Sequence, residues 1–528
     1  MLASSVRRLL RNESGNIGIM AAFAMVPLVL GAGIALDFSS LSNSKAELQN
    51  ALDAAVLAVA REGKEISDAD ANAIAQQFIR ANFDPEDVDL DLKRNGTRVT
   101  LKGGLRQKLA FAGLIGYDTA KVGAESSADI AYNKYEIALV LDTTGSMKGG
   151  KLASMKDAVV GLVDTMSTQI KDDEKLKFAV VPFANFVNVG KHFGPEFDKH
   201  GRLVNKTGAD WLDLRGRAEL PQLELKKGVS RFEVMHNLKD DWKGCVETRY
   251  SGPGEDYDVS DREAKKGDTK SLFVPSFSID EPDNGYGNSY IASWVDPLDN
   301  SAVAQIRKLV KYGVTSLVTD SGTLVPISGL GEWFVPATNM SGGRGPNRDC
   351  VTQPIVPLNN DYSSIKSRVK SLEANGTTNI MEGVAWGMRV LSPHEPFSEG
   401  RVKEPGVEKI MIVLTDGSNV FGNNNTSLRS SYSSNGYLVD GRIGIANGSS
   451  SDTNKIMNEK TLAACGNAKK EGIIVYTIRL EEPDVKTGMM LKDCATSAAH
   501  FFDAPSRSQL DDVFQEIREN VVRLRISS

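Results

Sequence analysis

The stretch DTTGSMKGGKL, which begins at Asp142, carries part of a nucleotide-binding pattern. Gly145, Gly150 and Lys151 match the P-loop, G-x-x-x-x-G-K-[ST], whose backbone and lysine hold nucleotide phosphates. A P-loop also needs a hydroxyl directly after its lysine to bind Mg²⁺, and this chain has Leu152 there. An apolar residue at that position suits the core face of the following helix, so the sequence disfavours nucleotide hydrolysis.

The same stretch contains oxygen ligands for a metal ion. Asp142, Thr144 and Ser146 follow an apolar run, and the carboxyl ends of strands are where open α/β sheets bind ligands. Two later loops offer more oxygens, because Thr378 precedes an expected helix and Asp416 ends another apolar run. Oxygen ligands suit a hard cation such as Mg²⁺. The pattern therefore predicts a Mg²⁺ site, with Mn²⁺ and Ca²⁺ as alternatives, although each loop also suits ordinary helix capping or a turn.

The elements that must position these residues alternate between strand and helix from Tyr135 onward. Apolar runs with the length of buried strands alternate with amphipathic helices, which indicates a mainly parallel sheet covered on both faces. The expected strands contain IALVL from Ile137, FAVVPF from Phe178, KIMIVL from Lys409 and GIIVYTI from Gly472. The expected helices carry core faces at Leu152, Met155, Val159, Val163 and Met166, and at Leu510, Val513, Phe514 and Ile517.

Two long regions interrupt this pattern, at about 184–355 and about 418–454. Loops of such length are usually functional or disordered. The first contains enough aromatic residues, including Trp211 and Phe232, to form a folded subdomain, and the sequence leaves open whether it covers the metal or extends the binding face. The second contains NNNTSLRSSYSSNG from Asn423 and is predicted to be a surface loop.

The series D-x-T-G-S, T-N-x-x-x-G and T-D-G, in this order along the chain, resembles the metal-ion-dependent adhesion site of von Willebrand factor A domains. The resemblance implies a doubly wound sheet of that type over residues 134–528. It assigns Asp142, Thr144 and Ser146 as primary ligands, Thr378 as a further hydroxyl ligand, and Asp416 as a ligand that acts directly or through water. Thr144 stands where serine is commoner, a change that keeps the hydroxyl.

Hydroxyl ligands leave most of the positive charge of the metal uncompensated, so an open coordination position attracts an Asp or Glu carboxylate of a partner protein. Such a site binds rather than catalyses, because catalysis also needs a placed base or nucleophile. The five histidines are scattered and form no H-E-x-x-H pattern. We therefore expect a protein that is not an enzyme. Its formal net charge of −6 and the scarcity of basic runs argue against a nucleic-acid partner.

Residues 17–36, IGIMAAFAMVPLVLGAGIAL, carry no charge, and as a helix they are long enough to cross a hydrocarbon layer of about 30 Å. Arg7, Arg8 and Arg11 precede this span, which predicts that residues 1–16 are cytoplasmic and that the bulk of the chain lies outside the cytoplasm. A retained anchor is favoured, and a cleaved signal peptide is the alternative.

Residues 37–133 are predicted to form a small α+β segment between the anchor and the sheet. The apolar stripe of the first helix continues to near Gly63, and Ser67 has the position of an N-cap for a second helix. Alternating stretches from Val88 and from Thr97 then indicate β-strands.

Four widely spaced cysteines, Cys245, Cys350, Cys465 and Cys494, show no C-x-x-C pattern. Outside the cytoplasm an even number of cysteines suggests disulfides. We favour Cys245–Cys350 within the first long insertion and Cys465–Cys494 near the C-terminus. The sequence alone permits three connectivities, as well as four separate buried thiols.

The stretch RNESGNIGIMAAFAMVPLVLGAGIALDFSSL, with LQNALDAAVLAVA after it, resembles the TadE/TadG-like N-terminus of Flp (tight adherence) pilus-assembly proteins. The likeness continues through WKGCVETR, GPNRDC and GVAWGMRVLSPHEPFSEG to the terminal LRISS, and it points to the TadG type, a pilin-like anchor joined to a von Willebrand A domain. It implies a single-pass protein of the bacterial inner membrane whose periplasmic part binds pilus-assembly components.

The N-terminus departs from pilin-like relatives that are processed by prepilin peptidase. Those relatives carry a glutamate shortly after the cleavage glycine, whereas the five residues from Asn16 that follow Gly15 include no acid. We therefore expect an uncleaved assembly or adhesion factor. The alternative is a minor pilin-like subunit or surface adhesin that is incorporated in the pilus.

Overall fold

The computed structural model divides the chain into two compact units, Met1–Asn133 together with Arg523–Ser528, and Lys134–Val522. The structure describes residues 16–62, 66–83, 88–95, 98–129, 134–170, 173–252, 254–281, 287–291, 295–318, 324–327, 338–404 and 406–522. The cytoplasmic segment predicted before Asn16, with its three arginines, and the terminal LRISS lie outside these residues.

The first unit begins with one long helix, α2, which spans Asn16–Glu62 and contains the predicted membrane span 17–36. In the part of the chain that the structure describes, one helix is long and apolar enough to cross a membrane, and it is the portion of α2 from Met20. The helix ends at Glu62, as the apolar stripe predicts. Most large apolar side chains of its first half are exposed, whereas its second half packs against the rest of the unit.

The remainder of the first unit is one short helix and a small antiparallel sheet. Helix α3 spans Asp68–Asn82, and the hydroxyl of its N-cap Ser67 accepts a hydrogen bond from Asp70 N–H, which confirms the predicted cap. The sheet has the order β1-β2-β3, with β1 at Asp89–Asn95, β2 at Arg98–Lys108 and β3 at Thr119–Asp129. The core between helix and sheet includes Leu48, Leu52, Val99 and Leu101.

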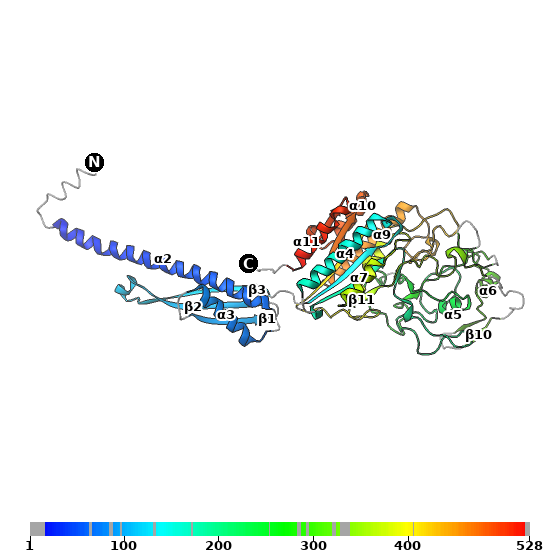
Figure 1. Ribbon diagram of the computed structural model, residues 1–528, viewed down its shortest axis with the longest axis horizontal. Coiled ribbons are helices and arrows are strands. Elements are labelled where there is room, and N and C mark those ends of the chain that lie inside the picture. Colours follow the sequence, from blue (N-terminus) through cyan, green and yellow to red (C-terminus); the bar gives the residue numbers. More distant parts are fainter. Residues whose placement is uncertain are drawn as a thin grey trace. The chain divides into compact units, whose positions relative to one another are not determined.

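The second unit is built on a six-stranded sheet with the order β11-β5-β4-β12-β13-β14. Figure 1 draws this unit in colours from cyan to red along the chain. The strands are β4 at Lys134–Asp142, β5 at Leu176–Phe183, β11 at Val356–Asn359, β12 at Val407–Thr415, β13 at Ile474–Leu480 and β14 at Phe501–Ala504. All neighbours are parallel except β11, which runs antiparallel to β5. The four predicted strands are confirmed, and the two short edge strands β11 and β14 were missed.

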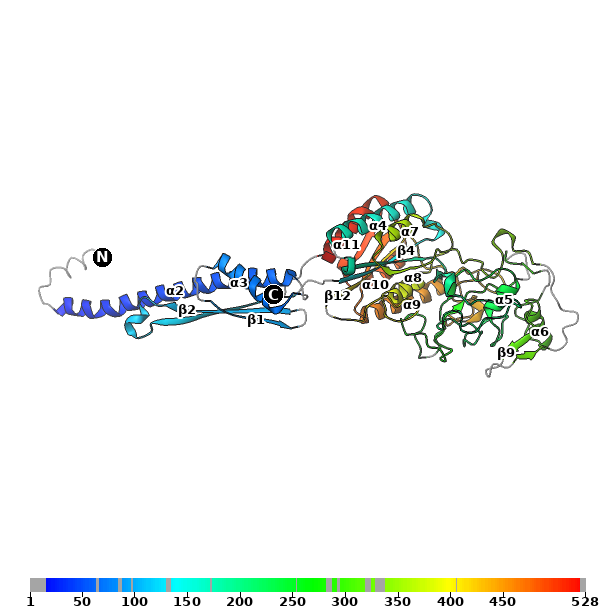
Figure 2. The same cartoon turned by 60° about the horizontal axis from the view of Figure 1, so that its bottom comes forward.

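Helices cover both faces of this sheet (Figure 2). Side chains alternate along β4, so that Ile137 and Leu139 enter one core and Ala138 and Val140 the other. The first core is closed by α4 (Gly150–Gln169), α7 (Tyr362–Lys370) and α11 (Leu510–Val522). The second is closed by α8 (Ile380–Val390), α9 (Ser450–Lys470) and α10 (Val485–Cys494). The core faces predicted for α4 and α11 are confirmed, with Leu152 at the edge rather than fully buried.

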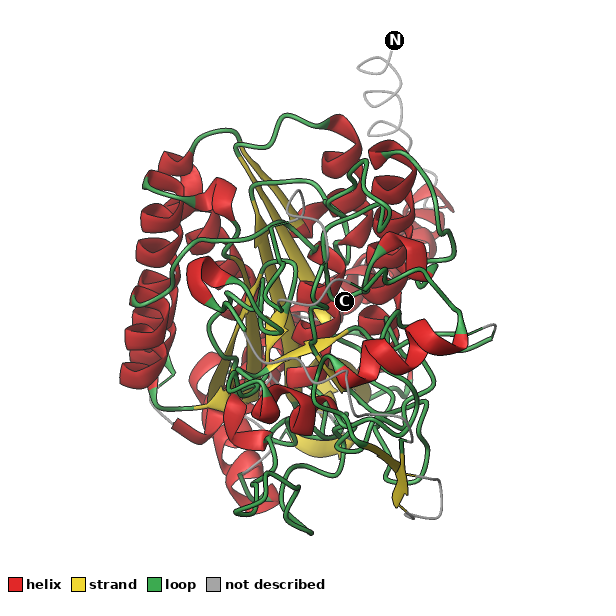
Figure 3. Cartoon of the chain, turned by 90° about the vertical axis from the view of Figure 1, so that its right-hand side faces the viewer, coloured by secondary structure: helices red, strands yellow, loops and turns green. Residues whose placement is uncertain are grey.

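The long insertion between β5 and β11 continues the second core rather than forming a detached lobe. Irregular backbone connects its short elements (Figure 3). They are β6 (Val187–Asn188), α5 (Arg231–Asn237), β7 (Cys245–Glu247), β8 (Val274–Pro275), α6 (Ala302–Val310), β9 (Ser316–Val318) and β10 (Leu324–Pro326). Its buried aromatic residues include the predicted Trp211 and Phe232, and Phe273 packs against Trp386 of α8.

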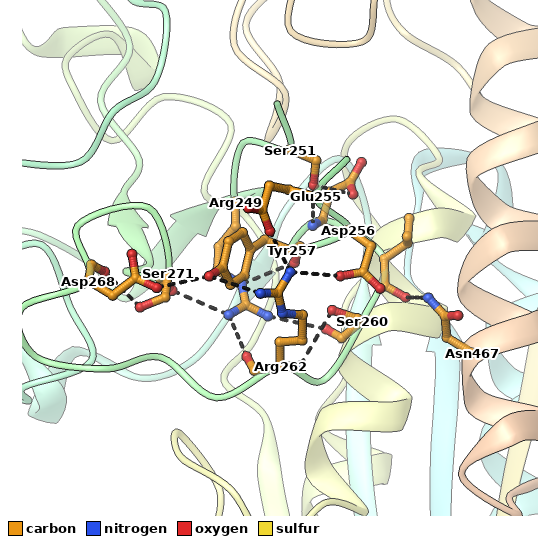
Figure 4. A network of polar contacts seen from close by, with 12 residues as sticks. Arg249, Ser251, Glu255, Asp256, Tyr257, Ser260, Arg262, Asp268, Ser271 and Asn467 are labelled. Atoms are coloured by element: carbon orange, nitrogen blue, oxygen red, sulfur yellow. Dashed lines mark hydrogen bonds and ion pairs between the residues drawn. The ribbon is translucent and has the colours of Figure 1, made fainter. Parts of the chain in front are cut away.

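Side chains of α8 and α9 bind backbone carbonyls of the insertion next to its own buried Arg249. Figure 4 shows Arg249 with Tyr257 and Ser260, and Asn467 on α9. Arg249 donates hydrogen bonds to the carbonyl oxygens of Tyr257 (3.1 Å) and Ser260 (3.2 Å), and Arg389 of α8 donates to the same two oxygens. Burial lowers the pKa of Arg249 well below its usual range, and the nearby charge of Arg389 adds to this effect. From α9, Asn467 donates to the carbonyl of Val259 at 3.1 Å.

The prediction that NNNTSLRSSYSSNG is a surface loop is wrong for its second half. Ser430, Tyr432 and Ser434 are buried, and Tyr432 packs 5.2 Å from Phe186, between ring centroids. Tyr432 also donates to the carboxylate of Glu247 and accepts from the N–H of Phe277 (2.7 Å). Polar residues enter the core here because partners from the insertion satisfy their hydrogen bonds.

Both disulfides that we favoured are present. Cys245–Cys350 joins the first part of the insertion to its end, and Cys465–Cys494 joins α9 to α10. Each bond closes a long loop, which restricts the unfolded chain.

Candidate functional site

The predicted site residues lie at the centre of the six-stranded sheet. Asp142 is the last residue of β4, and Asp416 follows the last residue of the adjacent strand β12. The chain order of the strands reverses between β4 and β12, so two loops diverge there and leave room at the carboxyl ends. Such a reversal is the usual ligand position of open α/β sheets.

A chain of oxygen atoms connects the three predicted loops. The hydroxyl of Thr378 donates to the hydroxyl of Thr144 at 3.3 Å, and the Thr144 and Ser146 hydroxyl oxygens are 3.0 Å apart. Ser146 in turn donates to Oδ1 of Asp416 at 2.6 Å. The structure thus brings together side chains that are up to 272 residues apart, counted from Thr144 to Asp416.

The carboxylate of Asp142 lies beneath these hydroxyls and is buried. Its Oδ1 accepts from the N–H of Thr144 at 2.8 Å, and its Oδ2 accepts from the hydroxyl of Thr415 at 2.6 Å. Burial raises the pKa of Asp142 to about 6, and repulsion from the Asp416 carboxylate contributes to the rise. A positive charge bound nearby would favour the ionised form and offset both effects.

Lys151 reaches the same site from the first turn of α4. Its ammonium group donates to Oδ2 of Asp416 at 2.8 Å, and the lysine side chain is partly exposed while that of Asp416 is buried. The lysine of the P-loop pattern therefore makes an ion pair within the protein.

Backbone contacts hold the loops at this spacing. The N–H of Gly145 donates to the carbonyl of Gly376 at 2.9 Å, and the N–H of Asn375 donates to the carbonyl of Thr143 at 2.8 Å. Gly376 has φ +87°, a conformation that other residues rarely adopt. At Gly417 a Cβ would lie 3.3 Å from the hydroxyl oxygen of Thr378, so a larger residue would crowd the cluster.

The two long regions support the loop that carries Thr378. The neighbouring Asn379 caps α8 and donates to the hydroxyl of Ser434 at 3.0 Å. The hydroxyl oxygen of Ser434 lies 3.0 Å from that of Thr248 in the insertion, and Thr248 donates to the buried carboxylate of Glu382 in α8. Contacts of the insertion with α8 and with Ser434 therefore help to hold Asn379, and with it the neighbouring Thr378, in place.

The cluster is open to solvent on one side, because Ser146 is exposed. Among the described residues, no group of three or more His, Cys, Asp and Glu side chains could hold a metal. A cation at this place would depend on hydroxyl oxygens beside the two aspartates. The sequence reasoning missed two site residues: Thr415, which is the T of the T-D-G motif, and Lys151 in its role as partner of Asp416.

Comparison with known proteins gives one family match. Residues 15–62 match the family model described as Flp pilus-assembly TadE/G-like. No curated protein matches the chain.

Solved structures similar to this chain include pilus proteins. The pilus adhesin SpaC of Lactobacillus rhamnosus GG is 10% identical, with a TM-score of 0.32 over 83% of this chain and 35% of the SpaC chain. The vWF domain of the type V pili tip protein Mfa5 of Porphyromonas gingivalis is 9% identical, with a TM-score of 0.32 over 75% of this chain and 99% of that domain. The PilB minor pilin of Streptococcus sanguinis is 11% identical, with a TM-score of 0.31 over 82% of this chain and 78% of PilB. TM-scores this low do not establish a shared fold.

Proposed function

We propose that this protein is a membrane-anchored pilus-assembly or adhesion factor whose second unit is a von Willebrand A-type domain that binds a partner through a metal-ion-dependent site. The observation that carries the proposal is the convergence of three hydroxyls and two carboxylates from three loops at the central reversal of strand order. The match of residues 15–62 to a pilus-assembly family supports the cellular role.

The donor set fits Mg²⁺, with Mn²⁺ and Ca²⁺ as alternatives. Oxygens at about 2.1 Å from an octahedral Mg²⁺ lie about 3 Å from their neighbours. The oxygens of Thr378, Thr144 and Ser146 follow one another at 3.3 and 3.0 Å, close to that edge length. The hydroxyls of Thr144, Ser146 and Thr378 would hold the ion, with Asp142 and Asp416 as its negative charges.

A bound cation would supply an electrostatic attraction for a carboxylate at the exposed edge of the site. Ser146 lies at that edge. Asp142 is buried, and it orients the loop by accepting a hydrogen bond from the N–H of Thr144. Lys151 neutralises Asp416 and so leaves the site less negative toward an approaching Asp or Glu. We propose a binding role without catalysis for this site.

The same proposal places the site in the bacterial periplasm. The exposed apolar first half of α2 would cross the inner membrane, with the N-terminus on the cytoplasmic side. Two disulfides suit an oxidising compartment.

A minor pilin-like subunit or a surface adhesin is the second candidate, because the family match begins at Gly15, next to the position at which processing would occur. Sequencing the mature N-terminus separates the two. An unprocessed N-terminus supports the anchored factor, and a mature chain that starts at Asn16 would favour the pilus subunit.

The proposal is tested with a pair of adjacent threonines. Thr144→Val removes a hydroxyl of the cluster, whereas Thr143→Val removes a hydroxyl that donates to the carbonyl of Phe183 outside it. We expect Thr144→Val to weaken Mn²⁺ binding, measured by the free Mn²⁺ signal in electron paramagnetic resonance, by about tenfold or more, or about 1.4 kcal/mol. Bacteria that carry this variant in place of their own gene should lose surface pili or adhesion. Equal behaviour of the two variants would contradict the proposal.

A further inference from the structure

The loop that joins β2 to β3 is fastened to α2 at one carboxylate. Asp37 of α2 accepts hydrogen bonds from three successive backbone N–H groups of this loop, at Ala110 (3.0 Å), Phe111 (2.9 Å) and Ala112 (2.7 Å). Asp37 is buried by the contact. In both views of the first unit the β2–β3 hairpin runs beside α2 (Figures 1 and 2).

A contact at one glycine of α2 shows where along the helix axis the loop packs. A Cβ at Gly33 would lie 2.5 Å from Cγ of the Phe111 ring, so the ring rests directly on the helix backbone there. Gly33 belongs to the last turn of the apolar span 17–36, and Asp37 is the first residue after it. The loop therefore lies level with the end of the apolar span.

The loop directs its apolar side chains outward at this level. Leu114 is 74% exposed, Tyr117 is 67% exposed and Ile115 is also exposed. Backbone hydrogen bonds are made within the loop, for example from Tyr117 N–H to the carbonyl of Ala112 at 3.1 Å, so its tip does not depend on water for them. Phe38, the residue after Asp37 on α2, is 72% exposed as well. Large apolar groups gathered in this way mark an interaction surface.

Basic side chains flank the same loop on the two strands that it connects. Arg106 and Lys108 near the end of β2 and Lys121 near the start of β3 are exposed, and Arg106 faces Lys121 in the strand register. An apolar tip with basic residues behind it is the arrangement of segments that bind the interface of an anionic bilayer.

We propose that the β2–β3 loop is a second membrane contact of this protein, in which Leu114, Ile115 and Tyr117 insert into the lipid interface beside the end of the anchor helix. The occupant is a lipid surface because the apolar patch is continuous with the membrane span and the adjacent basic residues match anionic headgroups. This inference rests on the membrane anchor of the proposed function. Two contacts, one on the helix and one on the loop, would fix the orientation of the first unit relative to the membrane.

The test measures depth in the bilayer at three positions of the full chain. All four native cysteines are in disulfides, so an introduced cysteine is a single reactive thiol for a nitroxide label. Leu114→Cys reports on the loop, Leu28→Cys on the exposed side of the span, and Lys93→Cys on β1. Lys93 pairs with Thr100, eight residues before Lys108, so this control lies about 26 Å along the strand from the loop.

In vesicles of phosphatidylethanolamine and phosphatidylglycerol, the ratio of collision rates with oxygen to those with a water-soluble nickel chelate rises with depth. We expect the ratio at Leu114 to exceed that at Lys93 severalfold and to approach the ratio at Leu28. A high ratio at Leu28 with an aqueous ratio at Leu114 would overturn the inference and leave the anchor intact. An aqueous ratio at Leu28 would overturn the anchor itself and the inference with it.

Variants that disrupt the contacts between α2 and the loop provide a second test. Asp37→Ala removes the acceptor of three N–H groups, and Gly33→Val places a side chain against Phe111. Either change should lower the ratio at Leu114 and leave the ratio at Leu28 unaltered. An unchanged ratio at Leu114 in both variants would contradict the tether.

Discussion

Substitution of Asp142 by asparagine should stabilise the metal-free protein, although it removes a ligand of the proposed site. Burial and the neighbouring Asp416 raise the pKa of Asp142 from 3.8 to about 6. Below pH 3.8 the group is protonated in both the folded and the unfolded chain and contributes nothing. Above pH 6 the group is ionised in both states. Ionisation is less favourable in the folded state, so it lowers the free energy of unfolding. At about 1.36 kcal/mol per pKa unit, the cost near pH 7.5 is about 3 kcal/mol.

Asp142→Asn removes this cost and keeps the local hydrogen bonds. The amide oxygen can accept from Thr144 N–H, and the amide nitrogen can donate to the hydroxyl of Thr415, which the wild-type carboxylate engages as an acceptor. We expect the unfolding free energy of this variant in EDTA at pH 7.5 to exceed that of the wild type by up to about 3 kcal/mol. The gain in unfolding free energy that Asp142 gives the wild type as the pH falls from 6 to 4 should be absent in the variant.

The assay is urea unfolding of residues 134–522, with and without Mg²⁺. Wild type should gain stability from Mg²⁺ and Asp142→Asn should gain none, because a ligand stabilises only a fold that binds it. Asp157→Asn, at an exposed position of α4, is the matched control and should leave both results unchanged. A variant that is destabilised in EDTA at pH 7.5 as much as at pH 4 would refute the reasoning.

Three further outcomes are expected. Lys151→Met should raise Mg²⁺ affinity about fivefold, since a partly exposed ion pair with Asp416 is worth on the order of 1 kcal/mol; weaker Mg²⁺ binding, or loss of ATP turnover, in this variant would instead favour the P-loop interpretation. Glu281→Gln should stabilise the protein above pH 7 and have little effect at pH 4 in unfolding titrations, because burial raises the pKa of Glu281 to about 7. Replacement of Cys465 and Cys494 by serine should cost about 3–4 kcal/mol of unfolding free energy for a closed loop of this length, and dithiothreitol should then have no further effect at that pair.

Local patterns in the sequence were sufficient for most of the sheet and for the first unit. Four strands, the cap at Ser67 and the end of α2 follow from periodicity and capping chemistry, which depend on neighbouring residues alone. The edge strands β11 and β14 have four residues each, too few for an alternation to be recognised.

Contacts between distant residues could not be predicted in the same way. Ser434 was expected at the surface because it is polar, but it is buried by partners in the insertion and beside α8. The ion pair of Lys151 with Asp416 joins residues 265 positions apart, and the tether of Asp37 joins α2 to a loop 73 to 75 positions away. Asp142, Thr144, Ser146 and Asp416 were identified because they follow apolar strands, and Thr378 because it precedes a helix. The residues that support them carry no local pattern.

Isothermal titration calorimetry of Mg²⁺ and Mn²⁺ tests the central claim most directly, with residues 39–528 as wild type and as the Asp142→Ala, Asp416→Ala double variant. The proposed site predicts saturable binding of one ion in the wild type and its loss in the variant. Absence of binding in both proteins, or equal binding in both, would contradict a metal-ion-dependent site at the ends of β4 and β12.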